Sequence, residues 1–425
     1  MVRSNSQNKG GNKGQNFRGK SAPRGNPKNF AGDCLSLPEN SVNFTSGRVS
    51  ECVEYWRSLT SDPWVLEAIT GYRLPFVSFP NPSWVPAPII MPPDQCKIMD
   101  EEVKTLLEKE AIEVTSSAYL LHKVFLVEKK TSGFRPIINL KPLNAHLAVE
   151  HFKMERVTMV RDLLEERMCM VKLDLKDAYF SIPVSEEDRK YLQFHWNGVN
   201  YQYKCLCFGL ATAPFVFTKV FKPLVNLFRS KGIRIIYYLD DSLLMCRSRE
   251  NLLEQVHFTI RSIQSAGFTV NFEKSLLDPV TLIEFLGVSI CSLSMTFGTS
   301  KDKSKTIADL AICLSQAELL SCRQLARFVG LVISQNLSIR TCHLHLRSLQ
   351  QEMIVALRSQ LPWDQLFKLS TDGREELKWW ASNANQLPRA PILLSSADHT
   401  IESDASNMGW GARYNYLTTG GSWSQ

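Results

Sequence analysis

Short apolar runs recur through the centre of the chain at the length and spacing typical of β-strands. The runs that fit this pattern are Val124–Val127, Phe134–Asn139, Met168–Leu173, Ile233–Tyr238, Leu243–Met245 and Thr281–Ile290. A Lys-Lys-Thr-Ser-Gly turn separates the first two and predicts a hairpin. Asp174 follows the third run, while Asp240 and Asp241 fill the turn of a second expected hairpin. The pattern therefore places acidic residues at strand ends.

Other stretches carry apolar residues at helical spacing. The helices expected from this spacing lie at about 103–107, 212–227, 252–263 and over most of 303–386. Residues 401–416 alternate like a strand again. Interleaved strands and helices predict an α+β chain whose sheet carries a site on its rim.

The first 100 residues differ from the rest in composition. Residues 1–32 hold seven basic side chains and no acid, and without them 42 basic residues balance 42 acidic ones. This segment predicts a disordered basic tail, which is either an electrostatic tether for phosphate backbones or a solubilising leader. Residues 33–100 are rich in proline and predict an extended leader, with regular structure beginning near Asp100.

The bulk composition is that of a globular protein, with 44% hydrophobic and 21% charged residues. No apolar run reaches the roughly 18 residues of a membrane span, and the N-terminus resembles no secretory signal. We therefore expect an intracellular protein, cytoplasmic or nuclear, without a membrane partner. The eleven scattered cysteines predict free thiols, and Cys342, His343 and His345 fit no zinc-site spacing.

The aspartates are the residues that carry chemistry. Asp240 and Asp241 lie between two strongly apolar strands, so their charges need partners, and hard divalent cations with oxygen ligands are natural ones. Together with Asp174 they could hold two Mg²⁺ ions, with Mn²⁺ as an alternative. Such a pair of ions, about 4 Å apart, activates an attacking hydroxyl and stabilises a leaving pyrophosphate.

Several segments resemble motifs of one family, the reverse transcriptases, in that family's order. They are Val-Lys-Leu-Asp174-Leu-Lys-Asp177-Ala-Tyr179, Cys-Phe208-Gly209-Leu-Ala-Thr-Ala-Pro214, Tyr-Tyr238-Leu239-Asp240-Asp241, Phe285-Leu286-Gly287, and Lys129-Lys130 with Phe134-Arg135-Pro136. An aromatic-x-Asp-Asp sequence alone is a weak signal, whereas five ordered motifs are a strong one. The residues within these motifs look most like those of retrotransposons of the DIRS or Ty3/gypsy kind, with DIRS slightly favoured.

The resemblance implies a right-hand polymerase with an antiparallel palm sheet. The expected parts are the tail 1–32, the leader 33–100, fingers and palm 101–295, a helical thumb and connection 296–395, and an incomplete ribonuclease H-like segment 396–425. The implied function is RNA- and DNA-directed DNA synthesis on a DNA primer paired to an RNA or DNA template. The oligomeric state does not follow from the sequence.

Roles carry over by motif position. Asp174 and Asp240 would be the main metal ligands, with Asp241 in support. The residues implied to meet the incoming dNTP are Lys129, Lys130, Arg135, Asp177, Ala178, Tyr179, Phe208 and Gly209, with Tyr179 excluding a 2′-hydroxyl. Those implied to contact the primer are Tyr238, Leu239, Phe285, Leu286 and Gly287.

The segment around Asp404 looks like the first strand of a ribonuclease H domain. Ribonuclease H chemistry needs several carboxylates from separate elements, and only 21 residues follow Asp404. We therefore expect a vestigial segment, frayed or weakly docked, that does not cut RNA.

Two other interpretations stay open. A catalytically inactive relic that only binds nucleic acid would fail metal-dependent primer extension. An RNA-dependent RNA polymerase would prefer NTPs to dNTPs, and the Tyr179 motif disfavours it.

Overall fold

The computed structural model describes residues 44–82, 91–128, 133–393 and 398–423. The expected basic tail, residues 1–32, lies outside these ranges, as do Lys129 and Lys130. Within the described ranges, no helix combines the length and apolar character needed to cross a membrane.

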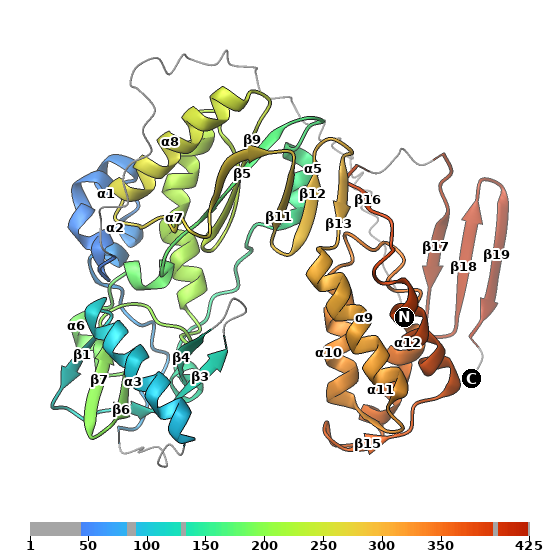
Figure 1. Cartoon of the computed structure of the whole chain (residues 1–425), viewed down its shortest axis with the longest axis horizontal. Coiled ribbons are helices and arrows are strands. Elements are labelled where there is room, and N and C mark those ends of the chain that lie inside the picture. The colour runs from blue at the N-terminus through green and yellow to red at the C-terminus, as the bar shows by residue number, and fades with distance from the viewer. Residues whose placement is uncertain (1–43, 83–90, 129–132, 394–397, 424–425) are drawn as a thin grey trace, which may run out of the picture. The chain divides into compact units, whose positions relative to one another are not determined.

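The central sheet has the strand order β10-β5-β9-β8, and every neighbouring pair is antiparallel (Figure 1). Its strands are β5 (Cys169–Asp174), β8 (Arg234–Tyr238), β9 (Asp241–Cys246) and β10 (Leu276–Val280). The predicted strand at 168–173 and the hairpin around the aspartate pair are confirmed, and so is the α+β class with its antiparallel sheet.

Both faces of β5, β8 and β9 are buried, and alternate residues of each strand pack on opposite sides of the sheet. Val171, Ile235 and Leu244 pack into the largest core cluster, on the side of two helices. Their neighbours Ile236 and Leu243 pack instead with residues of the strands that follow the sheet in sequence. Burial on both faces explains why these strands read as nearly continuous apolar runs.

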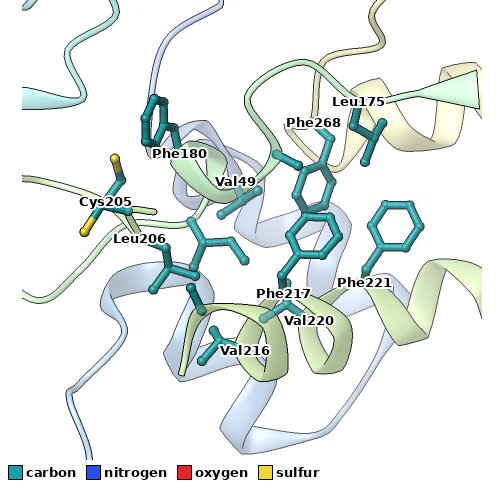
Figure 2. Packing of buried hydrophobic residues seen from close by; sticks show 14 of the residues in the cluster. Val49, Leu175, Phe180, Cys205, Leu206, Val216, Phe217, Val220, Phe221 and Phe268 are labelled. Atoms are coloured by element: carbon teal, nitrogen blue, oxygen red, sulfur yellow. The ribbon is translucent and has the colours of Figure 1, made fainter. Parts of the chain in front are cut away.

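The two covering helices are α7 (Ala213–Ser230) and α8 (Arg249–Ser265). Both were expected, and Gly267 (φ +89°) follows the C-cap of α8. α7 continues through Pro223 as one helix. Its apolar stripe faces inward: Figure 2 shows Phe217 and Phe221 against Phe268, with ring centroids 5.7 and 5.4 Å from it.

The expectation of an extended leader over 33–100 is wrong for the described residues in that range. They form η1 (Arg48–Cys52), α1 (Val53–Leu59), α2 (Pro63–Gly71) and the first half of α3 (Pro93–Glu108). Trp56 is fully buried, and its Nε1–H donates to the Ala266 carbonyl at 3.0 Å. A Cβ on Gly267 would lie 2.7 Å from the Val49 backbone, so this glycine allows the first helices to approach α8 closely. The segment is part of the core.

A second sheet has the order β1-β7-β6-β2 and stands beside a separate hairpin, β3–β4. The strands are β1 (Ile112–Thr115), β2 (Leu121–His122), β3 (Val124–Glu128), β4 (Phe134–Ile138), β6 (Gln193–Trp196) and β7 (Val199–Tyr203). Short helices α4 (Lys141–Asn144), α5 (Val160–Leu163) and α6 (Glu186–Arg189), with η2 (Val157–Met159) and η3 (Ala178–Ser181), connect them to the central sheet. The predicted hairpin of 124–139 is confirmed.

The strand predicted over Thr281–Ile290 is instead a hairpin. β11 (Leu282–Phe285) pairs with β12 (Val288–Cys291), and Leu286 and Gly287 form the turn with φ of +48° and +75°. β13 (Thr296–Gly298) and β16 (Ala390–Pro391) complete this sheet.

The remaining residues form a helical part and a final small sheet. The helical part has its own core and consists of α9 (Lys301–Gln316), α10 (Cys322–Ile333), α11 (Arg347–Arg358) and α12 (Thr371–Asn383), with the short pair β14 (Leu320–Ser321) and β15 (Leu366–Phe367). This matches the helices predicted for 303–386. The last sheet consists of β17 (Glu402–Ala405), β18 (Gly409–Tyr414) and β19 (Leu417–Ser422), all antiparallel and largely exposed.

Candidate active site

Strand register brings the three predicted aspartates to one edge of the central sheet. Asp174, the last residue of β5, pairs with Asp241, the first residue of β9. Tyr238 ends β8 and also pairs with Asp241, so Leu239 and Asp240 make the turn. Leu239 has a φ of +53°, which lets the chain reverse within two residues. Carboxylates far apart in sequence are therefore neighbours.

Backbone hydrogen bonds fix this edge. The Leu175 N–H donates to the Asp240 carbonyl at 2.9 Å, which ties the turn to the end of β5. The Asn271 N–H donates to the Asp174 carbonyl at 2.8 Å, and the Asp174 N–H donates to Ser275 Oγ at 3.0 Å. Both backbone groups of Asp174 are thus engaged, which fixes the position of its backbone at the sheet edge.

Burial and mutual repulsion both disfavour ionisation of these carboxylates. The pKa of Asp241 is raised to about 6, chiefly by burial and less by Asp240 and Asp174, against the lowering effect of Lys172, whose Nζ lies 4.0 Å away. Burial and then Asp240 likewise raise the pKa of Asp174. Half-buried carboxylates that resist ionisation favour a divalent cation.

The donor set fits such a cation, because all three side chains offer hard oxygen ligands on one rigid edge. The arrangement is not a closed metal cage: among the described residues, no three His, Cys, Asp or Glu side chains are grouped tightly enough to hold an ion.

Beside the aspartates, three side chains contact one another in a row, called the stack below although its two rings are tilted by 59° to each other. Tyr179 of η3 lies with its ring centroid 5.3 Å from that of Phe208, and the Arg135 guanidinium of β4 lies 4.2 Å from the Phe208 centroid. Burial, with a smaller contribution from Asp240, raises the pKa of Tyr179 to about 12. The stack thus places two aromatic rings and the Arg135 guanidinium between the β3–β4 hairpin and the aspartate edge.

Gly209 lies where its loop contacts the end of β4. Its φ is +108°, and a Cβ there would lie 2.4 Å from the Ile138 carbonyl oxygen. Asn144 holds the same loop from the other side: its Nδ2 donates to the Gly209 carbonyl at 2.9 Å, and its Oδ1 accepts from the Ala211 N–H at 3.0 Å. Sequence reasoning missed Asn144, because no local pattern shows that its amide reaches a loop 65 residues away.

Asp177 adopts the left-handed conformation, with φ of +48°, and starts η3. Its Oδ2 accepts from Lys109 Nζ at 2.8 Å, an ion pair that sequence reasoning also missed. Lys109 follows α3 directly, and a lysine there is ordinarily explained by the helix dipole. Because the ion pair occupies its carboxylate, Asp177 can offer a ligand only its backbone, as can the buried Ala178 that begins η3.

Of the residues expected to contact a primer, four are placed at accessible positions. Tyr238 and Leu239 are half-buried at the aspartate turn, and Leu286 and Gly287 form the β11–β12 turn. Phe285 is fully buried in the core beneath the central sheet, so the expectation that its side chain touches a primer is wrong.

Asp404 is not part of this group. It lies on β17, exposed, in register with Gly411 of β18, and its Oδ1 accepts from the Ala405 N–H at 2.8 Å.

Comparison with known proteins assigns this part of the chain to a family. The family model described as reverse transcriptase (RNA-dependent DNA polymerase) matches residues 127–290, the stretch that contains both aspartate strands. Residues 127–290 are a reverse transcriptase domain. The domain includes the Arg135–Phe208–Tyr179 stack and the aspartate edge described above.

Relatives of the reverse transcriptase domain are polyproteins of retroviruses and retrotransposons. The Gag-Pol polyprotein of Rous sarcoma virus is 29% identical over 178 residues, which cover 40% of this chain and 11% of that polyprotein. The Tf2-3 transposon polyprotein of Schizosaccharomyces pombe is 24% identical over 226 residues, which cover 53% and 16%. The chain therefore spans a small fraction of the length of these relatives.

Solved structures share the fold. A foamy viral protease-reverse transcriptase in complex with double-stranded DNA has a TM-score of 0.60 at 15% identity, and the match covers 91% of this chain and 67% of that one. The same kind of protein in complex with an RNA/DNA hybrid gives 0.61 at 14%, over 92% and 54%. At this identity the likeness establishes an α+β polymerase fold.

Proposed function

We propose that this chain extends a DNA primer on an RNA or DNA template by nucleotidyl transfer from dNTPs. The observation that carries the proposal is the register of Asp174 with Asp241 beside Asp240, which gathers three carboxylates at one sheet edge. Two Mg²⁺ ions bound there would activate the primer 3′-hydroxyl and stabilise the leaving pyrophosphate.

The chain's own residues would bind and orient the nucleotide. Arg135 presents a planar guanidinium on the Phe208 face, suited to a triphosphate oxygen pair. The start of η3 at Asp177 and Ala178 offers backbone N–H groups that a short helix leaves without internal acceptors. Lys129 and Lys130, outside the described residues, are proposed to approach the same phosphates.

Sugar and base would be placed by the stack and the loop beneath it. Tyr179 stands on Phe208, and its ring would occupy the space that a 2′-hydroxyl requires. Because Gly209 has no side chain, its loop can pass close to β4, and no side chain at this position would obstruct the nucleotide. The primer end would lie over Tyr238 and Leu239, with the turn of Leu286 and Gly287 behind it.

The deciding experiment compares dNTP incorporation on a primed homopolymer template for the wild type and Asp240→Asn, with Mg²⁺ and with chelator. The variant keeps the side-chain shape and removes the charge, so incorporation should fall to background, while primer–template binding, dominated by phosphate contacts, stays near wild type. Asp309→Asn, an exposed position on α9, is the matched control and should extend normally. Substantial incorporation by Asp240→Asn would contradict the two-metal assignment.

The inactive relic is the less favoured alternative, because the three carboxylates are present and positioned by register. A wild-type protein that binds primer–template but incorporates no dNTP with Mg²⁺ or Mn²⁺ would restore it.

A further inference from the structure

A cavity of about 620 Å³ opens between the N-terminal helices, α7 and the segment before β5. None of the three aspartates lines it, and the stack of Arg135, Phe208 and Tyr179 is also absent from its walls. Its lining includes Lys153, Lys219, Lys222, Phe152 and Phe215. This volume is within the range of roughly 300–1,000 Å³ common for small-molecule sites.

Three lysines line this cavity without a carboxylate partner. Lys219 and Lys222 are three residues apart on α7, so they share one face of the helix, and Lys153 approaches from the segment before β5. Among the described residues, no acidic side chain forms an ion pair with any of the three. Like charges that converge without a counterion favour an anionic ligand.

The two acidic residues in the wall are already engaged. Asp62 caps α2 and accepts from the Trp64 N–H at 2.9 Å. Glu155 pairs with the Arg229 guanidinium at 2.6 Å and accepts from the Tyr237 N–H at 3.1 Å. Glu155 is therefore neutralised by Arg229, and even with the charge of Asp62 counted, the three lysines leave the cavity wall with a positive surplus.

The wall also carries aromatic rings. Phe152 lies edge-to-face with Phe215, with centroids 5.6 Å apart, and Phe215 packs in turn on Trp64 at 5.8 Å. The Lys219 ammonium lies 3.9 Å from the Trp64 ring centroid, which holds this charge at the aromatic surface. Cations beside half-buried rings suit a ligand with an anionic group and a planar ring.

We propose that this cavity binds a nucleoside phosphate, with the lysines on the phosphate and the Phe152–Phe215 wall against the base. The source is either a free nucleotide or a nucleotide within a nucleic-acid strand, since both present the same chemistry. The site is separate from the aspartate edge, and the proposal does not depend on the polymerase activity.

The test titrates the full chain with dAMP in chelator, with inorganic phosphate and deoxyadenosine as separate probes, by calorimetry at low salt. dAMP should bind more tightly than either part alone. Lys219→Gln/Lys222→Gln should weaken dAMP binding about ten-fold or more, because it removes two charge-assisted contacts. Phe152→Leu should reduce the preference for dAMP over phosphate and leave phosphate binding unchanged.

Lys231→Gln/Lys305→Gln is the matched control: it removes the same charge from exposed positions that do not line the cavity, and should bind dAMP as the wild type does. A 5′-phosphorylated oligothymidylate separates the sources. A lysine-dependent gain of oligonucleotide over dAMP assigns the site to a strand, and the lack of such a gain assigns it to a free nucleotide. Equal dAMP affinity of the two double variants, or binding of dAMP no tighter than phosphate, would overturn the proposal.

Discussion

At the scale of single residues, the aspartate edge and the tyrosine beside it are held by very different forces. Register and backbone hydrogen bonds position Asp174, whereas Tyr179 is positioned by packing on Phe208 and Phe217. Register cannot change without moving an entire strand, so the aspartates are rigid. Packing of one ring can be altered singly, which makes Tyr179 the residue through which substrate choice can be tested.

Tyr179→Ala should raise ribonucleotide use relative to dNTP use by about ten-fold or more, which corresponds to about 1–3 kcal/mol of discrimination. The reason is that the removed ring would otherwise occupy the position of the 2′-hydroxyl. Single-nucleotide incorporation with matched dNTP and rNTP measures this ratio. Tyr179→Phe keeps the ring and should keep the wild-type ratio; an unchanged ratio in the alanine variant would leave Tyr179 a core residue only.

The pKa of Asp241, raised to about 6, predicts how stability depends on pH in the metal-free protein. Between the ordinary aspartate pKa near 4 and this value, the folded state binds more protons than the unfolded state. Stability in chelator should therefore fall as pH rises from about 4 to 7, and Mg²⁺ should restore it at pH 7. Thermal unfolding across this range measures the effect. Asp241→Asn should flatten the dependence; an equally steep fall in that variant would contradict the assignment.

At the scale of elements, β5, β8 and β9 were predictable because each is buried on both faces and reads as one apolar run, whereas the more exposed β10 was not predicted. The helices α7 and α8 were predictable from their apolar stripes. The N-terminal helices were not. α2 begins with Pro63, directly after its N-cap residue Asp62. From the sequence alone, a proline in the first turn of a helix cannot be distinguished from one that prevents a helix.

The site was predictable only where a motif is local. The aspartate pair and Gly209 follow from their sequence neighbours, but Asn144 and Lys109 act through contacts between segments that are distant in sequence. The turn at Leu286 was missed for a different reason: a leucine with φ of +48° contradicts its own backbone preference and is held there by the flanking strands.

The N-terminal helices give a prediction of their own. Trp56→Ala should lower the free energy of unfolding by about 3–5 kcal/mol, since it removes a fully buried ring against Phe268 and leaves the Ala266 carbonyl without its donor. Urea denaturation measures the change. Trp56→Phe, which keeps an aromatic ring, should cost less, and Arg57→Ala on the exposed side of the same helix should cost little. A loss below about 1 kcal/mol for the alanine variant would mean that these helices are dispensable to the core.

At the scale of the whole molecule, charge is distributed unevenly. All of the formal excess of +7 lies in residues 1–32, outside the described structure. Deleting them should weaken nucleic-acid binding and flatten its salt dependence, by up to about 0.9 in the logarithmic slope for each basic residue that contacts a phosphate. The rate of incorporation at saturating primer–template should not change.

Affinity measured over a range of salt concentrations tests this. Replacement of the seven basic residues by glutamine at constant length is the matched control for chain length and should reproduce the deletion. Equal salt slopes for the wild type and both variants would leave the tail as a passive leader.

The hydrogen bond from Trp56 to Ala266 joins two residues that are synthesised at different times. The two residues are 210 positions apart, and translation at about 5–20 residues per second separates their appearance by about 10–40 seconds. During that interval Trp56, Val65 and Ile69 have been made, but α8 and Phe268, which cover Trp56, have not. During this interval α1 and α2 therefore expose apolar surface on the nascent chain. Chaperones that bind such surface should associate with the nascent chain until residue 268 has emerged.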